Sequence, residues 1–367
     1  MKFTCEKALL VSAISVAGRT VAAKSAIPCL EGILLRAGVG VQLTGFNLET
    51  GITVKVGASV TEAGLCVMPA RLFFDIVRKL PDDIVTIEVD DKLQVSIRGG
   101  ASSFKITAMD AEDYPDLPDV NGANGISMPQ SALREMIGGT IFSVSENQAR
   151  PIHTGCLMEV RDETITMVAV DSFRLARRTW HSETPLGQEL KFVVPATGLR
   201  EVEKILADTD EPAVFTLGTK HILFQIGDAT LVCRILEGEF IDWRRVVPTN
   251  CPVKLTANVA ELTSSIERVS LIVSEKIKSP VRCVFGENTA DFRTTNTIGS
   301  AHDTCDIAGN GGELEIGFNC RYLLDALRAV PSQEVMLELQ NGLSPIVFTP
   351  VDEKMDFAYM VLPVRLH

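Results

Sequence analysis

One pattern occurs three times in this chain of 367 residues and constrains its fold more than any other feature. Each copy contains the end of a predicted strand, an amphipathic helix and a further strand. The copies are aligned at Pro69, Pro195 and Phe318, which are offset by 126 and 123 residues. A repeat that spans a third of the chain is as long as a whole domain and longer than a solenoid unit. The sequence therefore predicts three tandem copies of one domain.

Each copy combines two helical patterns with several alternating ones. Helices are expected at residues 6–18, 70–80, 131–143, 196–207, 258–271 and 320–330. After the second helix, apolar residues alternate on both sides of the turn Asp90-Asp91, which indicates an antiparallel hairpin. Phe104 and Ile106 continue as the last strand of the first copy. This order predicts an α+β fold in which two helices per domain pack on antiparallel sheets.

The apolar stripe of the 70–80 helix is expected to pack on a sheet; it consists of Leu72, Phe73, Ile76, Val77 and Leu80. Segments rich in Pro, Gly and Asn near residues 113–125 and 246–252 mark the boundaries between the copies. The predicted domains are therefore residues 1–122, 123–250 and 251–367.

The first apolar run, at residues 8–18, resembles a signal peptide, but Glu6 and Lys7 adjoin it and its apolar residues have helical spacing. An amphipathic helix that stops at Gly18 explains the run better. No run reaches the length that crosses a membrane. The nine cysteines are scattered and never form C-x-x-C, which indicates buried, reduced thiols. We therefore expect a cytoplasmic protein.

The charge distribution is uneven. The net charge is −12, whereas the six helical windows together carry +2 and the remaining chain −14. A protein with this balance does not wrap nucleic acid with its whole surface, but it can present one face to DNA. The helix that carries Arg71, Asp75 and Arg78 repeats this spacing at residues 321, 325 and 328. Solvated helix faces are the simpler explanation of such counts.

Motifs for catalysis or cofactor binding are absent from the sequence. The five histidines form no H-E-x-x-H, and His181-Ser182-Glu183 is not followed by the P-C-x-x-C of zinc deaminases. The chain has no G-x-x-x-x-G-K-[ST] phosphate loop and no G-x-S-x-G elbow. Asp82-Asp83 suits a turn better than acid–base chemistry. We expect no enzymatic activity, no cofactor and no metal site.

Several motifs along the whole chain together resemble the bacterial DNA polymerase III beta subunit, the replicative sliding clamp. They are Met1-Lys2-Phe3-Thr4, Ile27-Pro28, Pro69-Ala70-Arg71, Asp113-Tyr114-Pro115, residues 171–176 (DSFRLA), residues 242–248 (DWRRVVP), Glu275-Lys276, Ile316-Gly317-Phe318-Asn319 and the C-terminal residues 359–366 (YMVLPVRL). The resemblance implies a head-to-tail homodimer that closes into a ring, encircles double-stranded DNA and slides along it. It also implies a non-catalytic tether for the polymerase III alpha subunit, other polymerases, the clamp loader and repair proteins.

The resemblance places a pocket for short hydrophobic peptides between the second and third domains. Its residues are His153, Val170, Ser172, Phe173, Arg174, Leu175, Ile241, Arg245, Val246, Ile277, Asn319, Tyr322, Leu343, Ser344, Met360, Leu362, Pro363, Val364 and Arg365. An apolar set with a polar rim suits extended peptides that carry a polar anchor followed by Leu or Phe. Two departures stand out: Ser172-Phe173 replaces the usual Gly-His, and aliphatic residues replace the usual methionines at 362 and 364.

Two further sets of residues follow from the same resemblance. DNA-facing roles are expected for Lys24, Arg71, Arg78, Arg150, Lys204, Arg321 and Arg328. The dimer interface is expected to join Phe104 and Ile106 to Leu271 and Ile272 of a second copy. Burial of Phe104 and Ile106 within their own domain is the alternative. A repeated scaffold that never encircles DNA is the alternative for the whole protein, and ring closure distinguishes the two.

Overall fold

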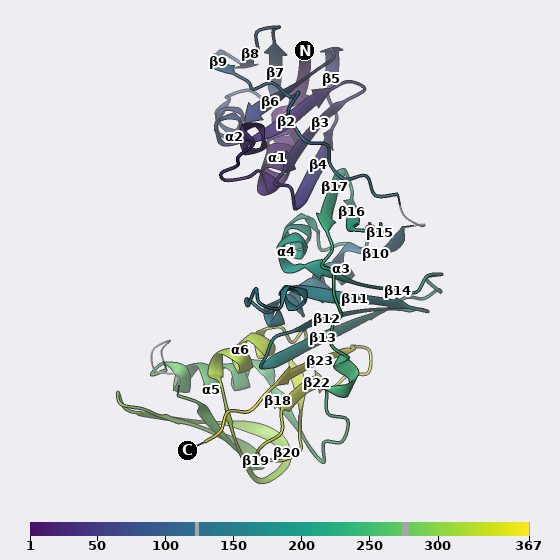
Figure 1. Ribbon diagram of the computed structural model, residues 1–367. Helices are drawn as coiled ribbons and strands as arrows, with labels where there is room; N and C mark the ends of the chain where they lie inside the picture. Colours follow the sequence, from purple (N-terminus) through teal and green to yellow (C-terminus); the bar gives the residue numbers. More distant parts are fainter. Residues whose placement is uncertain (122–124, 274–278, 367) are drawn as a thin grey trace. The chain divides into compact units, whose positions relative to one another are not determined.

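The computed structural model describes residues 1–121, 125–273 and 279–366 (Figure 1). All six predicted helices are present in this part of the chain, but the third is shorter than the predicted 131–143, because a turn follows Gly138 and Ile141–Ser143 forms a separate 3-10 helix. They are α1 (Lys7–Ala17), α2 (Ala70–Lys79), α3 (Gln130–Gly138), α4 (Ala196–Ile205), α5 (Val259–Ser270) and α6 (Cys320–Arg328). No described helix combines the length and apolar character that a membrane crossing requires.

The described strands form three antiparallel sheets. The five-stranded sheet has the order β5 (Ser59–Glu62), β1 (Lys2–Glu6), β7 (Ile84–Val89), β8 (Gln94–Gly99) and β9 (Ser102–Thr107). The eight-stranded sheet has the order β10 (Ile126–Pro129), β15 (Pro212–Leu217), β16 (His221–Ile226), β17 (Ala229–Arg234), β4 (Thr50–Val56), β3 (Val41–Phe46), β2 (Gly32–Ala37) and β6 (Gly64–Pro69). The ten-stranded sheet has the order β14 (Leu190–Pro195), β11 (Gly155–Arg161), β12 (Thr164–Val170), β13 (Arg174–His181), β23 (Phe357–Val361), β22 (Ile346–Pro350), β21 (Glu334–Leu339), β18 (Val253–Asn258), β20 (Ser300–Phe318) and β19 (Val281–Thr295).

The two larger sheets continue across the predicted domain boundaries. Strand β17 of the second copy pairs with β4 of the first, and β13 of the second copy pairs with β23 of the third. The chain accordingly packs as two compact units, Met1–Leu133 with Arg200–Ile235 and Arg134–Leu199 with Leu236–His367. Each copy thereby covers a sheet edge that would otherwise expose unpaired backbone groups.

Helix α2 illustrates how the local sequence determines packing. Phe73, Ile76 and Val77 lie at helical spacing and are buried. The prediction that Leu72 belongs to this buried stripe is wrong, because Leu72 lies at the edge of the stripe and is 48% exposed. The helix ends with Arg78 and Lys79, whose charges are favourable at a C-terminus.

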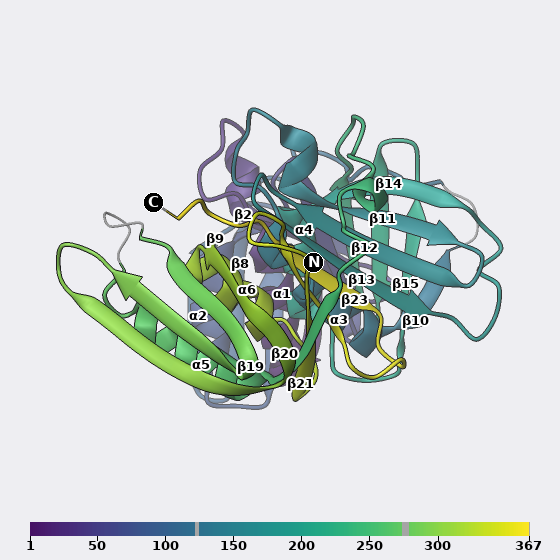
Figure 2. The same ribbon diagram turned by 90° about the horizontal axis from the view of Figure 1, so that it is seen from below.

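The third copy contains a long hairpin of β19 and β20, which Figure 2 shows in light green beside α5. Its ladder is irregular between Phe285 and Thr289, where Asn288 has a positive φ of 56°. Bulges of this kind bend a strand. The Thr294 hydroxyl donates to the Pro280 carbonyl at 3.2 Å, so the far half of β19 lies beside its beginning.

Candidate functional site

An apolar seam joins the second and third copies inside the second compact unit. Val170, Leu175 and Met360 are buried in one hydrophobic cluster, and Ile241 packs against it. Leu175 and Met360 are directly paired in the ladder between β13 and β23. Four of the predicted pocket residues therefore form one continuous floor.

The turn between β12 and β13 places an aromatic ring beside this floor. The carboxylate of Asp171 accepts hydrogen bonds from the backbone N–H groups of Phe173 at 2.7 Å and Arg174 at 2.9 Å. The N–H of Leu362 donates to the Phe173 carbonyl at 2.8 Å. With its backbone held on both sides, Phe173 stacks on Tyr322 of α6, with ring centroids 5.8 Å apart and planes at 21°. The Phe173 side chain nevertheless stays 53% exposed and available for contact.

Arg174 lies beneath this aromatic pair. Its guanidinium forms ion pairs with Asp171 at 2.9 Å and with Asp325 of α6 at 2.6 Å, and it lies 4.6 Å from the Tyr322 ring centroid. The side chain is only 11% exposed. Burial, together with the charge of Asp171, raises the pKa of the Tyr322 hydroxyl. Arg174 thus links β13 to α6, and much of its charge is already neutralised.

The C-terminal tail carries further predicted pocket residues and lies against β20. Val364 makes an antiparallel bridge with Gly317 of β20, and its N–H donates to the Gly317 carbonyl at 2.8 Å. A Cβ at position 317 would lie 2.8 Å from the Val364 oxygen and 2.6 Å from a methyl carbon of Leu366. Only glycine therefore lets the tail approach β20 so closely. The tail borders a hollow of about 670 Å³ that Glu315, Gly342, Leu343, Pro363, Val364, Arg365 and Leu366 line.

Five of the predicted pocket residues have large apolar side chains that are exposed. Leu343 is 81% exposed, and Phe173, Val246, Leu362 and Val364 are exposed to between 36% and 53%. Of these, Leu343 and Val364 line the same hollow, and Leu362 is hydrogen-bonded to Phe173. Contiguous exposed apolar side chains are typical of a surface for a binding partner.

A buried carboxylate holds the segment that connects the second and third copies. Glu159 of β11 is 2% exposed and accepts hydrogen bonds from Arg244 at 2.7 Å and from the Trp243 indole at 3.3 Å. Lys191 lies 3.7 Å away, and the Arg244 guanidinium lies 4.2 Å from the Trp243 ring. Burial raises the pKa of the Glu159 carboxyl, but Arg244, Trp243 and Lys191 outweigh burial and hold this pKa below its usual value.

Sequence reasoning missed this anchor, although one signal was present. Glu159 is the single charged residue within Gly155–Val160, a run whose other members are apolar and buried. A carboxylate at such a position requires partners. The segment that Glu159 holds also carries Arg245 and Val246 of the predicted pocket, with Ile241 just before it.

The remaining predicted pocket residues have varied roles. Asn319 caps α6 by accepting from the Arg321 N–H at 3.0 Å. The His153 ring lies edge-on to Phe240 at 5.5 Å, and burial followed by the charge of Arg150 lowers the pKa of His153. Ser172 and Arg245 are exposed, Ser344 is half-buried, and Ile277 lies outside the described residues.

All seven residues that were expected to face DNA are exposed. Three of them pair with carboxylates: Arg78 with Asp75 at 3.5 Å, Lys204 with Glu201 at 2.7 Å and Arg328 with Glu267 at 2.7 Å. For Lys24, Arg71, Arg150 and Arg321, the described residues provide no ion-pair partner. Neighbouring carboxylates therefore offset part of the positive charge of these seven residues.

Two of the sheet edges formed by the described residues concern the predicted dimer interface. Strand β9 pairs only with β8, and Phe104 on it is 39% exposed while Ile106 is half-buried. Residues 300–306 of β20 pair with β19, whereas β18 pairs with β20 only at Ile307 and Ala308.

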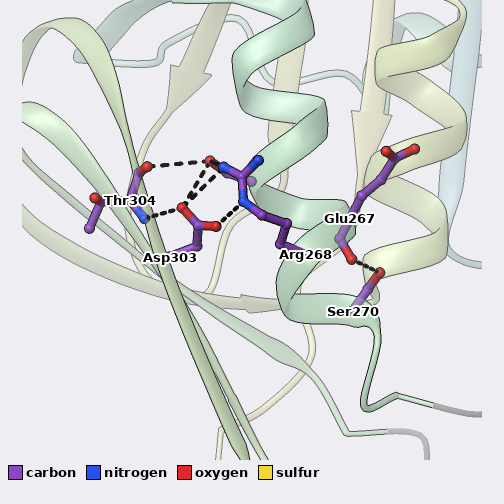
Figure 3. A network of polar contacts seen from close by, with 6 residues as sticks. Glu267, Arg268, Ser270, Asp303 and Thr304 are labelled. Carbon is purple, nitrogen blue, oxygen red and sulfur yellow. Dashed lines mark hydrogen bonds and ion pairs between the residues drawn. The ribbon is translucent and has the colours of Figure 1, made fainter.

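The end of α5 is fastened beside this edge of β20 (Figure 3). Arg268 pairs with Asp303 and also donates to the Ser265 hydroxyl at 3.0 Å. The hydrogen bond from Arg268 holds the pKa of Asp303 below its usual value. Leu271, just after the helix, is 82% exposed, and the Ile272 carbonyl accepts from Asn296 at 2.8 Å.

No group of three potential metal-ligating side chains is found in the ranges that the structure describes. The candidate site thus consists of the buried apolar seam, the hollow at the C-terminal tail and the sheet edges at β9 and β20.

Comparison with known proteins gives one consistent result. Family profiles for the N-terminal, central and C-terminal domains of the DNA polymerase III beta subunit match residues 1–118, 127–242 and 244–365. A beta sliding clamp from Staphylococcus epidermidis is 29% identical, with both chains fully covered. The sliding clamp from Bacillus subtilis is 29% identical with a TM-score of 0.94, and the beta subunit from Streptococcus pyogenes is 27% identical with a TM-score of 0.95; both alignments cover each chain completely.

Fold and profiles together define a protein of three tandem clamp domains. The chain belongs to the family of DNA polymerase III beta subunits, the beta sliding clamps. Members of this family are non-catalytic processivity factors of DNA replication.

Proposed function

We propose that two copies of this chain close into a ring around duplex DNA and tether replication and repair proteins through the groove described above. The observation that carries the tethering role is the apolar seam of Val170, Leu175 and Met360 with exposed Phe173 and Leu362 beside it. A groove of this kind suits an extended peptide whose Leu or Phe side chains enter the apolar part. The partners we propose are the polymerase III alpha subunit, other polymerases, the clamp loader and repair proteins, and we propose the cytoplasm as the location.

The free edges support the proposed dimer. Phe104 and Ile106 of β9 face the same side as buried Ile97 and Val95 of β8, to which they are paired. A partly exposed apolar edge strand favours pairing with another chain. Residues 300–306 of β20 and exposed Leu271 form a different edge of the chain. A contact between these two different edges is heterologous, and two copies joined in this way form a closed ring when the rotation between them is right.

The charge pattern supports sliding rather than tight binding. Contacts to phosphates are independent of base sequence and become weaker with salt. Exposed residues such as Arg71 and Arg321 can attract the duplex. Asp75 and Glu267 form ion pairs with Arg78 and Arg328, which reduces the attraction of those two arginines for DNA. Weak attraction of this kind keeps DNA within the ring without pinning it at one sequence.

The tethering role is tested by deleting residues 363–367. Binding of a fluorescein-labelled peptide with a polar anchor followed by Leu and Phe is measured by fluorescence polarisation. We expect loss of binding with an unchanged dimer mass, because Pro363 and Val364 border the hollow and the tail makes no proposed ring contact. The control is Arg161→Gln, which changes an exposed residue of β11 outside the predicted pocket and should preserve binding. Unchanged affinity after the deletion would contradict the assignment of the groove.

Ring closure is tested separately by solution mass and by DNA topology. Sedimentation should give a dimer, and small-angle scattering should require a central hole. When a clamp-loader ATPase places the protein on nicked circular DNA, the complex should survive gel filtration in high salt and dissociate after the circle is cut. A monomer that stays equally bound to circular and linear DNA would favour the scaffold alternative.

A further inference from the structure

A second hollow adjoins the one that the C-terminal tail borders. Its volume is about 250 Å³, and three arginines line it: Arg282 and Arg293 of β19 and Arg365 of the tail. The larger hollow described above also has Arg365 and Leu366 in its lining. The two hollows are therefore neighbouring parts of one surface.

The bend of β19 explains how this cluster arises. Arg282 and Arg293 lie far apart along the strand, but the bulges after Phe285 fold the hairpin. The hydrogen bond between Thr294 and Pro280 fastens the folded halves together. The arginines consequently converge although nothing in their sequence spacing indicates it.

The hollow is positively charged in an acidic protein. None of its described lining residues is Asp or Glu, whereas the whole chain carries −12. Arg282 pairs with Glu315 across the hairpin, and Arg293 pairs with Asp291 at 2.6 Å. The described residues offer no ion-pair partner to Arg365. Since each guanidinium has five N–H donors, the paired arginines also retain donors for a ligand.

We propose that this three-arginine hollow binds the carboxylate of an Asp or Glu side chain that flanks the apolar anchor of a partner peptide. The inference rests on the proposed function of the adjoining groove. A volume of about 250 Å³ is smaller than most pockets for whole ligands and suits a single side chain. Arginine forks match carboxylates in geometry as well as in charge. The nearby carboxylates of Glu315 and Asp291 make the hollow less suitable for a nucleic-acid backbone, which carries a continuous row of charges.

The test uses three labelled peptides with the same apolar anchor, each extended at both ends by two Glu, two Gln or two Lys residues. Affinity for the full-length protein is measured by fluorescence polarisation at low salt and at about 0.5 M salt. The Glu peptide should bind about two- to fivefold more tightly than the Gln peptide, the range typical of one exposed ion pair, and the Lys peptide should bind most weakly. Salt should remove most of the difference.

Variants of the arginines test whether the preference for the Glu peptide arises at this hollow. Arg293→Gln should abolish the advantage of the Glu peptide while the Gln peptide binds as before, and Arg293→Lys should retain part of it. Arg161→Gln is the matched control, because Arg161 is exposed on β11 and has no ion pair among the described residues. Thermal unfolding of every variant establishes that it is folded.

Each outcome has a distinct meaning. Equal binding of the Glu and Gln peptides to the unmodified protein would overturn the inference and leave the proposed function intact. A Glu preference that survives Arg293→Gln, or displacement of the Glu peptide by a duplex oligonucleotide, would also overturn it. Failure of all three peptides to bind would refute the proposed peptide-binding function itself.

Discussion

The buried carboxylate of Glu159 leads to the sharpest prediction. In Glu159→Gln the side chain keeps its size but loses its charge, and its amide N–H₂ faces the cations that the carboxylate had attracted. The carboxylate accepts from Arg244 at 2.7 Å and from Trp243 at 3.3 Å. A hydrogen bond to a charged group contributes about 1.5–3 kcal/mol, but Arg244 is 45% exposed and can be hydrated in the variant. We therefore expect a destabilisation of about 1–3 kcal/mol.

Urea unfolding monitored by Trp243 fluorescence measures this loss. The second tryptophan, Trp180, is replaced by Phe in both proteins so that the signal reports on the connecting segment. The matched control is Lys191→Gln, because Lys191 is 55% exposed at 3.7 Å and should contribute less than about 1 kcal/mol. Since the segment also carries Arg245 and Val246, peptide affinity should fall in Glu159→Gln and stay nearly constant in the control.

The dependence on pH has a defined sign. Because the folded-state pKa of Glu159 is lower than its usual 4.5, its contribution is fully present above that value. The contribution is lost as pH falls through the lowered pKa. The stability difference between the unmodified protein and Glu159→Gln should thus shrink in acid. Equal stability at pH 7, or a difference that grows in acid, would refute the reasoning.

Three further predictions concern the edge, the aromatic pair and the thiols. Phe104→Asp should raise the dissociation constant of the proposed dimer about a hundredfold or more in sedimentation, because it places a charge where Leu271 of the other copy is expected. An unchanged mass would show that β9 is not part of the interface. Phe173→Ala should weaken peptide binding at least about fivefold without changing the unfolding midpoint, because the side chain that stacks on Tyr322 is 53% exposed. Unaltered peptide affinity would mean that the Phe173 ring makes no contact with the peptide. Burial raises the pKa of Cys66 to about 12. A thiol reagent at pH 8 should therefore modify this cysteine only after urea is added, because the thiolate is the reactive form. Rapid labelling of Cys66 in the native protein would contradict its burial.

The sequence by itself determined the repeat, the helices and the family. Helices are recognisable because their apolar period and their stop signals lie within a few residues of one another. Local sequence does not determine which residues at the edge of an apolar stripe are buried. Leu72 is apolar and adjoins the stripe of its helix, yet it is exposed. The groove could be predicted only through the positions of residues such as Leu175 and Met360 in a known family, because they are far apart in the chain.

The tertiary structure decided what depends on contacts between distant segments. The pairing of β17 with β4 and of β13 with β23 joins the copies into continuous sheets, which no repeat pattern shows. The bend in β19 gathers Arg282 and Arg293, and the fold brings Glu159 to Trp243. Local sequence encodes the dihedral preferences and the buried faces of single elements, whereas a sheet edge, a charged hollow or a buried ion pair exists only once folding has brought its separate parts together.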